Sequence, residues 1–310
     1  MTGVLTRGPS ANAGGVIGLG DDDAELAPRG RRRPGGRTRY LVGAVCVTIC
    51  TVMLLPLVVS VLASVKPTPE AAQTPPTYVP HGFSLDAYRR LWEYQSGLPT
   101  YVMNSLGTAL FTVVFTSVLT LLAGYGLARF PIPLKEPVFV VLLLALIIPY
   151  QALLTPIFLM FADLGLSNSL IGLAIIHTAI QLPFSLYIMR NSFEAVPREL
   201  EEAAMIDGAN SGQILVRVFI PAVVPALITV ALFAFITSWN EFLGALVLMN
   251  TDSKFTLPLI LASARTETTL GGTDWGMLQA GITISIVPCV GVYLLLQRYF
   301  VAGFLTGAVK

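Results

Sequence analysis

Six long stretches without a charged side chain restrict what this chain can fold into. Each holds more than the roughly 20 residues that a helix needs to cross about 30 Å of hydrocarbon. Only 12% of the 310 residues are charged, against about 25% in soluble domains. We therefore expect an all-α membrane protein with six transmembrane helices, at residues 41–65, 101–128, 138–162, 164–189, 218–240 and 275–297.

The connections between these stretches refine the expected topology. Only a short turn around Gly165 separates the third stretch from the fourth, which predicts a tight helical hairpin. The fifth is expected to continue through Glu241 to about Met249. Residues 1–39 are rich in Gly, Arg, Pro and Asp and should form a disordered tail before a membrane domain at 40–310. The first stretch is too long for a signal peptide, which favours a retained anchor.

Lysine and arginine positions orient the chain, because these residues concentrate in cytoplasmic loops. With a cytoplasmic N-terminus, 14 of the 19 fall inside, and the five outside are Lys66, Arg89, Arg90, Lys254 and Arg265. This predicts a multi-pass protein of the inner (cytoplasmic) cell membrane with both termini in the cytoplasm. The net charge of +1 comes from dispersed residues and gives no reason to expect nucleic-acid binding.

A charged segment at about residues 190–221 lies between the fourth and fifth stretches and would also be cytoplasmic. Pro197 suits the first position of a helix, and Gly208 suits its end. Asn210 and Gln213 have the spacing of a capping box that begins a second helix. Pro221 would mark the re-entry into the membrane. The segment is therefore predicted to be a helix-turn-helix.

This helix pair has two interpretations. One is an amphipathic loop on lipid headgroups, but such helices are usually basic, and this one is acidic. The other is a surface on which a soluble partner docks, and we favour it. Ala203 and Ala204 would let another surface approach closely, and Glu202 could accept a bidentate arginine. The expected apolar face of the first helix consists of Val196, Leu200, Ala203 and Ala204.

The segment also carries a specific spacing. Glu202-Ala203-Ala204 is followed after three residues by Gly208, and after nine more by Val218-Phe219-Ile220-Pro221. This resembles the EAA loop of permease subunits of binding-protein-dependent ABC importers, with conservative changes at 218 and 220. Similarity to the carbohydrate branch, in its maltose-type second permease, extends from about residue 98 to the C-terminus. It includes Asp207-Gly208-Ala209 and residues 239–242, 297–303 and 307–310.

The resemblance implies a fold, a function and partners. The fold would be that of an ABC importer permease with a cytoplasmic coupling loop. The chain would form half of the pore of an ATP-driven sugar importer, beside a second, different permease. Two ATPase subunits would bind ATP and Mg, and an extracytoplasmic solute-binding protein would deliver the sugar. Coupling would use Glu202, Ala203, Ala204, Asp207, Gly208 and Pro221, and Lys310 would lie close to the ATPases.

Three sequence motifs typical of nucleotide binding or of hydrolysis are absent from the chain. It lacks the G-x-x-x-x-G-K-[ST] phosphate loop, and Gly124-Tyr125-Gly126 fits helix packing instead. Neither H-E-x-x-H nor G-x-S-x-G occurs. Cys46 and Cys50 have no third ligand nearby, so no metal site is expected. We therefore expect no cofactor on this chain and no enzymatic activity of its own.

The solute path is less defined. Glu241 is the one carboxylate expected in or near a span, where ionisable groups are usually functional or paired. Trp239 could stack on a sugar, and Asn240 and Glu241 could bind hydroxyls. Alternatively, Trp239 anchors the helix at the outer interface, and Glu241 is solvated or pairs with the sister permease. His177 and Gln181 are expected to form interhelical hydrogen bonds.

Three other functions remain open at this stage. A permease of the same architecture could carry a phosphorylated polyol, although the predicted spans contain no Arg or Lys for a phosphate. A secondary transporter would usually show coupling charges and repeated halves, and neither is evident. A membrane scaffold without transport is the third.

Overall fold

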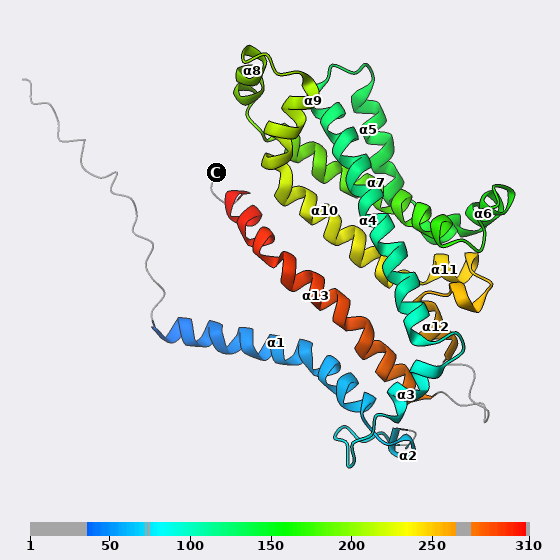
Figure 1. Ribbon diagram of the computed structural model, residues 1–310. Coiled ribbons are helices and arrows are strands. Elements are labelled where there is room, and N and C mark those ends of the chain that lie inside the picture. The colour runs from blue at the N-terminus through cyan, green and yellow to red at the C-terminus, as the bar shows by residue number, and fades with distance from the viewer. Residues whose placement is uncertain (1–35, 72, 74, 265–273, 308–310) are drawn as a thin grey trace, which may run out of the picture. The chain divides into compact units, whose positions relative to one another are not determined.

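The computed structural model describes residues 36–71, 73, 75–264 and 274–307, in which every regular element is a helix (Figure 1). The chain divides into two compact units, Met1–Val52 and Met53–Lys310. The described part of the first unit is the start of α1 (Gly36–Ser64), which begins inside the segment expected to be a disordered tail. The rest of that tail, and Lys310, lie outside the described residues.

The second unit holds four long helices, a bent pair and several short helices. The four long helices are α4 (Leu98–Arg129), α7 (Leu170–Glu194), α10 (Ile220–Asn240) and α13 (Trp275–Gly307). The end of α1, from Met53 to Ser64, also belongs to this unit. The bent pair is α5 (Lys135–Leu144) with the 3-10 turn η1 (Ala145–Ile147), followed by α6 (Tyr150–Asp163). The short elements are α2 (Thr68–Ala71), α3 (Asp86–Glu93), α8 (Arg198–Ile206), α9 (Ser211–Ile214), the π-helical turn η2 (Leu215–Phe219), α11 (Leu243–Leu248), the 3-10 turn η3 (Asp252–Lys254) and α12 (Leu257–Ala264).

Five helices in the described residues are long and apolar enough to cross a membrane, and a sixth crossing requires the bent pair to count as one. The five match the first, second, fourth, fifth and sixth expected spans. They run over Tyr40–Ser64, Leu98–Arg129, Leu170–Glu194, Ser211–Asn240 and Trp275–Arg298.

The third expected span is broken into α5 and α6, so it does not form the expected tight hairpin with the fourth along its whole length. Ile148 and Pro149 are both extended, with ψ of 120° and 116°, as is usual for a residue that precedes proline. The chain bends by 103° there. On one side of the bend, α5 stays beside α7, where the Arg190 guanidinium lies 4.2 Å from the Phe139 ring centroid. On the other side, Phe161 of α6 packs in a cluster with α11 residues.

The fifth span is also interrupted, contrary to the expected continuation to Met249. Helix α10 ends at Asn240, and Glu241 is extended, with φ −70° and ψ 130°. The chain then forms the separate helix α11. Two membrane segments in this unit are therefore broken, one after Ile147 and one after Asn240.

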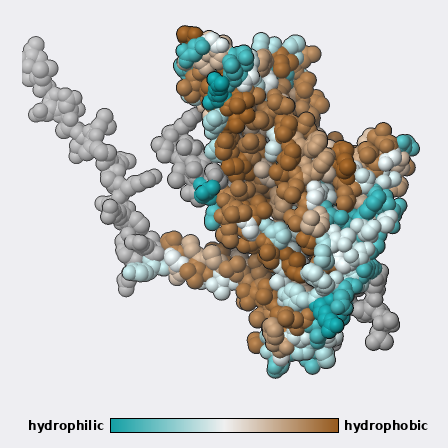
Figure 2. All heavy atoms as spheres, in the orientation of Figure 1, coloured by the Kyte–Doolittle hydropathy of each residue, from teal (hydrophilic) through white to brown (hydrophobic). Residues whose placement is uncertain are grey.

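Helices α4, α7 and α10 pack closely around a core of small and hydroxyl residues. A Cβ at Gly124 would lie 3.0 Å from Met189 Cβ and 3.2 Å from Arg190 N, so the expected close approach at Gly124 is confirmed. Four threonines spaced four residues apart along α4 are buried, at 108, 112, 116 and 120. Outside this core, Figure 2 shows a broad apolar surface between hydrophilic ends, one of which carries α8.

Candidate functional site

The helix-turn-helix at 197–214 forms as the sequence predicts. Helix α8 begins after Pro197 and ends before Gly208, whose φ of +81° favours glycine. The Asn210 side chain accepts from Gln213 N at 2.9 Å, and Gln213 returns a bond to Asn210 N at 3.0 Å, which completes the capping box. The turn thus has a fixed backbone geometry.

The two faces of α8 differ from the expected pattern. Val196, just before the helix, is buried and Ala204 is half-buried, whereas Leu200 and Ala203 are exposed. Glu202 is also exposed, and Ile206 is 87% exposed. The expected single apolar face is therefore split, and part of it is available to another molecule.

Arg129 at the end of α4 sets the rotation of α8. Its guanidinium lies 3.5 Å from the Glu201 carboxylate, and its side chain is 4% exposed. It donates hydrogen bonds to the carbonyl oxygens of Phe193, in the last turn of α7, and of Val196, just beyond that helix. It also lies 4.6 Å from the Phe219 ring centroid. Glu201 therefore faces the membrane helices, and its neighbour Glu202 faces away.

Pro221 lies near the start of α10, inside a continuous helical stretch, and its expected place at the re-entry into the membrane stays a prediction. The helix that starts at Ser211 continues to Asn240 as one candidate span. Just before Pro221 the chain widens into the π-helical turn η2, in which Ile220 N donates to the Leu215 carbonyl. Proline has no N–H to offer the preceding turn, so a local change of pitch there is expected. A displacement of α9 would therefore pass directly into α10.

The three residues expected along the solute path lie in different surroundings. Trp239 is 1% exposed, and its Nε1 donates to the Ser285 carbonyl at 3.1 Å, so its ring faces are not open to a solute here. Asn240 is exposed and donates to its own helix at the Ile236 carbonyl. Glu241 turns inward, to a partner in its own chain.

That partner is His177 on α7. His177 Nε2 lies 3.1 Å from Glu241 Oε2, and its side chain is 1% exposed. The other ring nitrogen lies 2.7 Å from Ser238 Oγ on α10. Gln181, one turn further along α7, accepts from Thr237 Oγ1 at 3.2 Å. The expected interhelical hydrogen bonding of His177 and Gln181 is confirmed.

Sequence reasoning missed the roles of Arg129 and Tyr150. From the sequence, Arg129 is one of the 14 basic residues expected in the cytoplasm, and Tyr150 is one residue of the third expected span. Tyr150 Oη donates to Glu241 Oε1 at 3.2 Å, across 91 residues of sequence. The run Ala128-Arg129 at the end of a span is a weak signal for a helix-end arginine, but no local pattern points to Glu201 as its partner.

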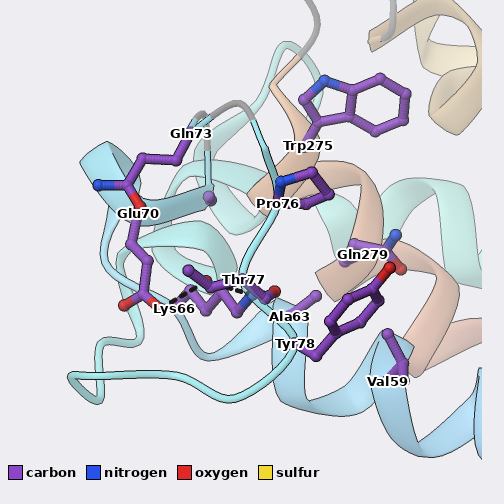
Figure 3. Close-up of a pocket in the computed structure, with 11 residues that line it drawn as sticks. Val59, Ala63, Lys66, Glu70, Gln73, Pro76, Thr77, Tyr78, Trp275 and Gln279 are labelled. Atoms are coloured by element: carbon purple, nitrogen blue, oxygen red, sulfur yellow. Dashed lines mark hydrogen bonds between the residues drawn. The ribbon is translucent and has the colours of Figure 1, made fainter.

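A cavity of about 470 Å³ lies at the other end of the second unit, between α1 and α13 (Figure 3). Lys66 Nζ donates to Thr77 Oγ1 at 3.0 Å, and Thr77 donates to Glu70 at 2.8 Å. Burial raises the pKa of Glu70, but hydrogen bonds from Thr77 and His81 outweigh it and hold that pKa below its usual value. Because these charged groups hydrogen-bond to one another, we interpret the cavity as part of the packing that holds the segment between α1 and α3 in place. Other lining residues are Val59, Ala63, Tyr78, Trp275 and Gln279.

Comparison with known proteins supplies a family. Residues 27–305 match the model for the binding-protein-dependent transport system inner membrane component. The chain is 33% identical, over 79% of its length and 87% of the relative's, to the diacetylchitobiose uptake system permease protein DasC of Streptomyces coelicolor. It is 31% identical, over 84% and 93%, to the arabinooligosaccharides transport system permease protein AraQ of Halalkalibacterium halodurans.

A solved structure resembles the whole fold. It is a chain of a bacterial ABC transporter involved in the import of the acidic polysaccharide alginate. The TM-score is 0.74 at 27% sequence identity, over 86% of this chain and 98% of that one.

Proposed function

This chain belongs to the family of binding-protein-dependent transport system inner membrane components and is a membrane permease, and from this we propose that it carries a saccharide in an ATP-driven importer. The relatives named above transport diacetylchitobiose and arabinooligosaccharides, and the similar solved structure belongs to an alginate importer. A saccharide is the solute class that these names share. The chain would form half of the pore beside a second, different permease.

One observation carries the coupling part of the proposal: α8 is held to the membrane helices by one face and is open on the other. Glu201 binds Arg129, while Glu202, Ala203 and Ile206 are exposed. We infer that an ATPase subunit docks on the exposed face and that Glu202 contacts it. ATP and Mg²⁺ would bind to that partner, and Lys310 would lie near it.

The proposed mechanism is mechanical. When two ATPase subunits close on ATP, they would push α8 and the turn at Gly208. Arg129 would pass the displacement to α4, and the unbroken helix through η2 would pass it to α10. The permease would then change between inward-facing and outward-facing arrangements, which are two states of one packed unit. An extracytoplasmic solute-binding protein would deliver the saccharide.

Gly208→Pro tests the coupling. Proline fixes φ near −65°, whereas Gly208 has φ +81°, so the turn cannot keep its geometry. In vesicles that hold the complete transporter, we expect uptake to fall at least about tenfold while ATP hydrolysis continues. Gly291→Ala is the control, because a Cβ there has no neighbour within 4 Å. Full uptake by Gly208→Pro at equal membrane abundance would refute the coupling role.

The solute class needs a separate measurement. The transporter is isolated through a tag on this chain, and the solute-binding protein that accompanies it is assayed against mono-, di- and oligosaccharides and phosphorylated polyols. We expect binding of a saccharide and competition for uptake by the same compound. If only a phosphorylated polyol binds, the solute is a polyol and the saccharide proposal is wrong, but the proposed role as a permease still stands.

A further inference from the structure

The two helix interruptions of the second unit meet at one carboxylate. Tyr150 is the first residue of α6, directly after the 103° bend. Glu241 is the first residue after α10 and is separated from α11 by Phe242 alone. The Tyr150 hydroxyl donates to Glu241 Oε1 at 3.2 Å. A single side chain thus contacts both breaks, although they are far apart in sequence.

Glu241 is fully occupied by donors of its own chain. Oε1 accepts from Tyr150 Oη and from Gly244 N at 2.7 Å. Oε2 accepts from Ala245 N at 3.3 Å and lies 3.1 Å from His177 Nε2. A carboxylate offers about four acceptor sites, so these four contacts use its capacity. No site is left for a solute hydroxyl in this arrangement.

The neighbouring residues are fitted to this cluster. Ser238 lies 2.7 Å from His177 Nδ1, which suits a tautomer with the proton on Nε2, facing Glu241. At Gly244, an added Cβ would lie 2.6 Å from Tyr150 Oη and 3.0 Å from Glu241 Oε2. Only glycine therefore allows Tyr150 to approach the carboxylate this closely.

We propose that Glu241 is a positioning residue that holds α6 and α11 to α7 as one rigid group, which moves as a single body during transport. The cluster joins α6 through Tyr150, α7 through His177 and α11 through Gly244. Glu241, which the sequence suggests as a solute contact, then connects helices and does not bind the solute. This inference rests on the proposed transport function, because the rigidity of this group affects the uptake rate only if the transporter changes state.

The first test is kinetic and uses the complete transporter in vesicles. Glu241→Gln removes the charge and turns one acceptor into a donor that faces His177 and Ala245 N–H. We expect the maximal uptake rate to fall about tenfold, with KM and the ranking of saccharides unchanged. Tyr150→Phe should lower the rate by a smaller factor, and the double variant should be no worse than Glu241→Gln alone. Gly244→Ala should lower the maximal uptake rate although it removes no polar group. The control Gly291→Ala should leave that rate unchanged.

Three results would overturn the proposal. A changed KM or saccharide ranking at an unchanged maximal rate would make Glu241 a solute contact. Additive effects of Tyr150→Phe and Glu241→Gln would show that the two do not act through one bond. A fall in thermal stability and membrane abundance, with unchanged uptake per folded transporter, would reduce the cluster to a structural role.

The second test needs no solute, so its outcome is independent of the saccharide assignment. Spin labels are placed on exposed positions of α6 and α7, at Leu159→Cys and Ile171→Cys, after Cys46, Cys50 and Cys289 are replaced by serine. We expect one narrow distance distribution, with and without ATP, and a broad distribution in Glu241→Gln. A broad distribution in the unaltered cluster, or no change in Glu241→Gln, would refute the rigid group even if the transporter carried another solute.

Discussion

Arg129 concentrates several weak interactions in one side chain. Its guanidinium has five N–H donors in a planar fork. Two of its bonds go to the carbonyl oxygens of Phe193 and Val196 at the end of α7. A helix leaves its last carbonyls without partners and favours a positive charge there. The same group pairs with Glu201 and lies over the Phe219 ring. Lysine, with a point charge and three donors, cannot reproduce this set.

We therefore predict that Glu201→Gln and Glu202→Gln have different effects despite their adjacent positions. Glu201→Gln loses the ion pair with the buried Arg129 and should lower the local stability of α8 by about 1 kcal/mol. Arg129→Lys should lower the local stability of α8 by at least as much. Hydrogen exchange of the α8 amides in the isolated permease measures this stability. Glu202→Gln should leave the exchange unchanged, because its side chain is exposed. Equal hydrogen exchange in all three variants would refute the role of the Arg129–Glu201 pair in holding α8 to the membrane helices.

Among the elements, those with strong local signals were predictable and those with tertiary causes were not. The apolar runs placed both ends of α4 to within three residues and the start of α13 at Trp275, whereas α7 begins six residues and ends five residues later than expected. The capping pair Asn210–Gln213 placed the start of α9. Pro56, Pro156, Pro183, Pro225 and Pro288 lie inside helices that continue past them, whereas Pro149 lies between two helices at the 103° bend. Its neighbour Tyr150 binds Glu241 from another element, and no window of sequence around Pro149 contains that contact.

The packing of α4 against α7 gives a prediction with an internal control. Gly124→Ala adds a methyl group 3.2 Å from Arg190 N, a backbone atom that cannot rotate away. Overpacking of this kind costs about 1–3 kcal/mol, and we expect a lower unfolding temperature of the purified permease. Gly107→Ala lies on the same helix with no neighbour within 4 Å. It should be neutral or stabilising, because alanine is the better helix former by about 1 kcal/mol. Equal unfolding temperatures for the two variants would argue against this interface.

Across the second unit, the length of α4 explains how α8 stays attached to the membrane helices. The helix has 32 residues and is about 48 Å long at 1.5 Å per residue, against about 30 Å of hydrocarbon. Its last turns can therefore extend beyond the hydrocarbon, where Tyr125 Oη donates to the Ser211 carbonyl at 3.4 Å and Arg129 reaches α8. From the charge distribution we expect this end to lie in the cytoplasm, and the proposed docking of an ATPase on α8 requires it.

The orientation can be measured with single cysteines in a chain whose Cys46, Cys50 and Cys289 are replaced by serine. Phe83 is 75% exposed between α2 and α3, and Ile206 is 87% exposed on α8. In intact cells, we expect a membrane-impermeant maleimide to label Phe83→Cys and not Ile206→Cys. In permeabilised cells that lack the ATPase, it should label both. Adding the ATPase should then protect Ile206→Cys alone, because docking would cover α8 and leave the external segment open. Labelling of Ile206→Cys in intact cells would reverse the orientation and exclude α8 as the ATPase contact.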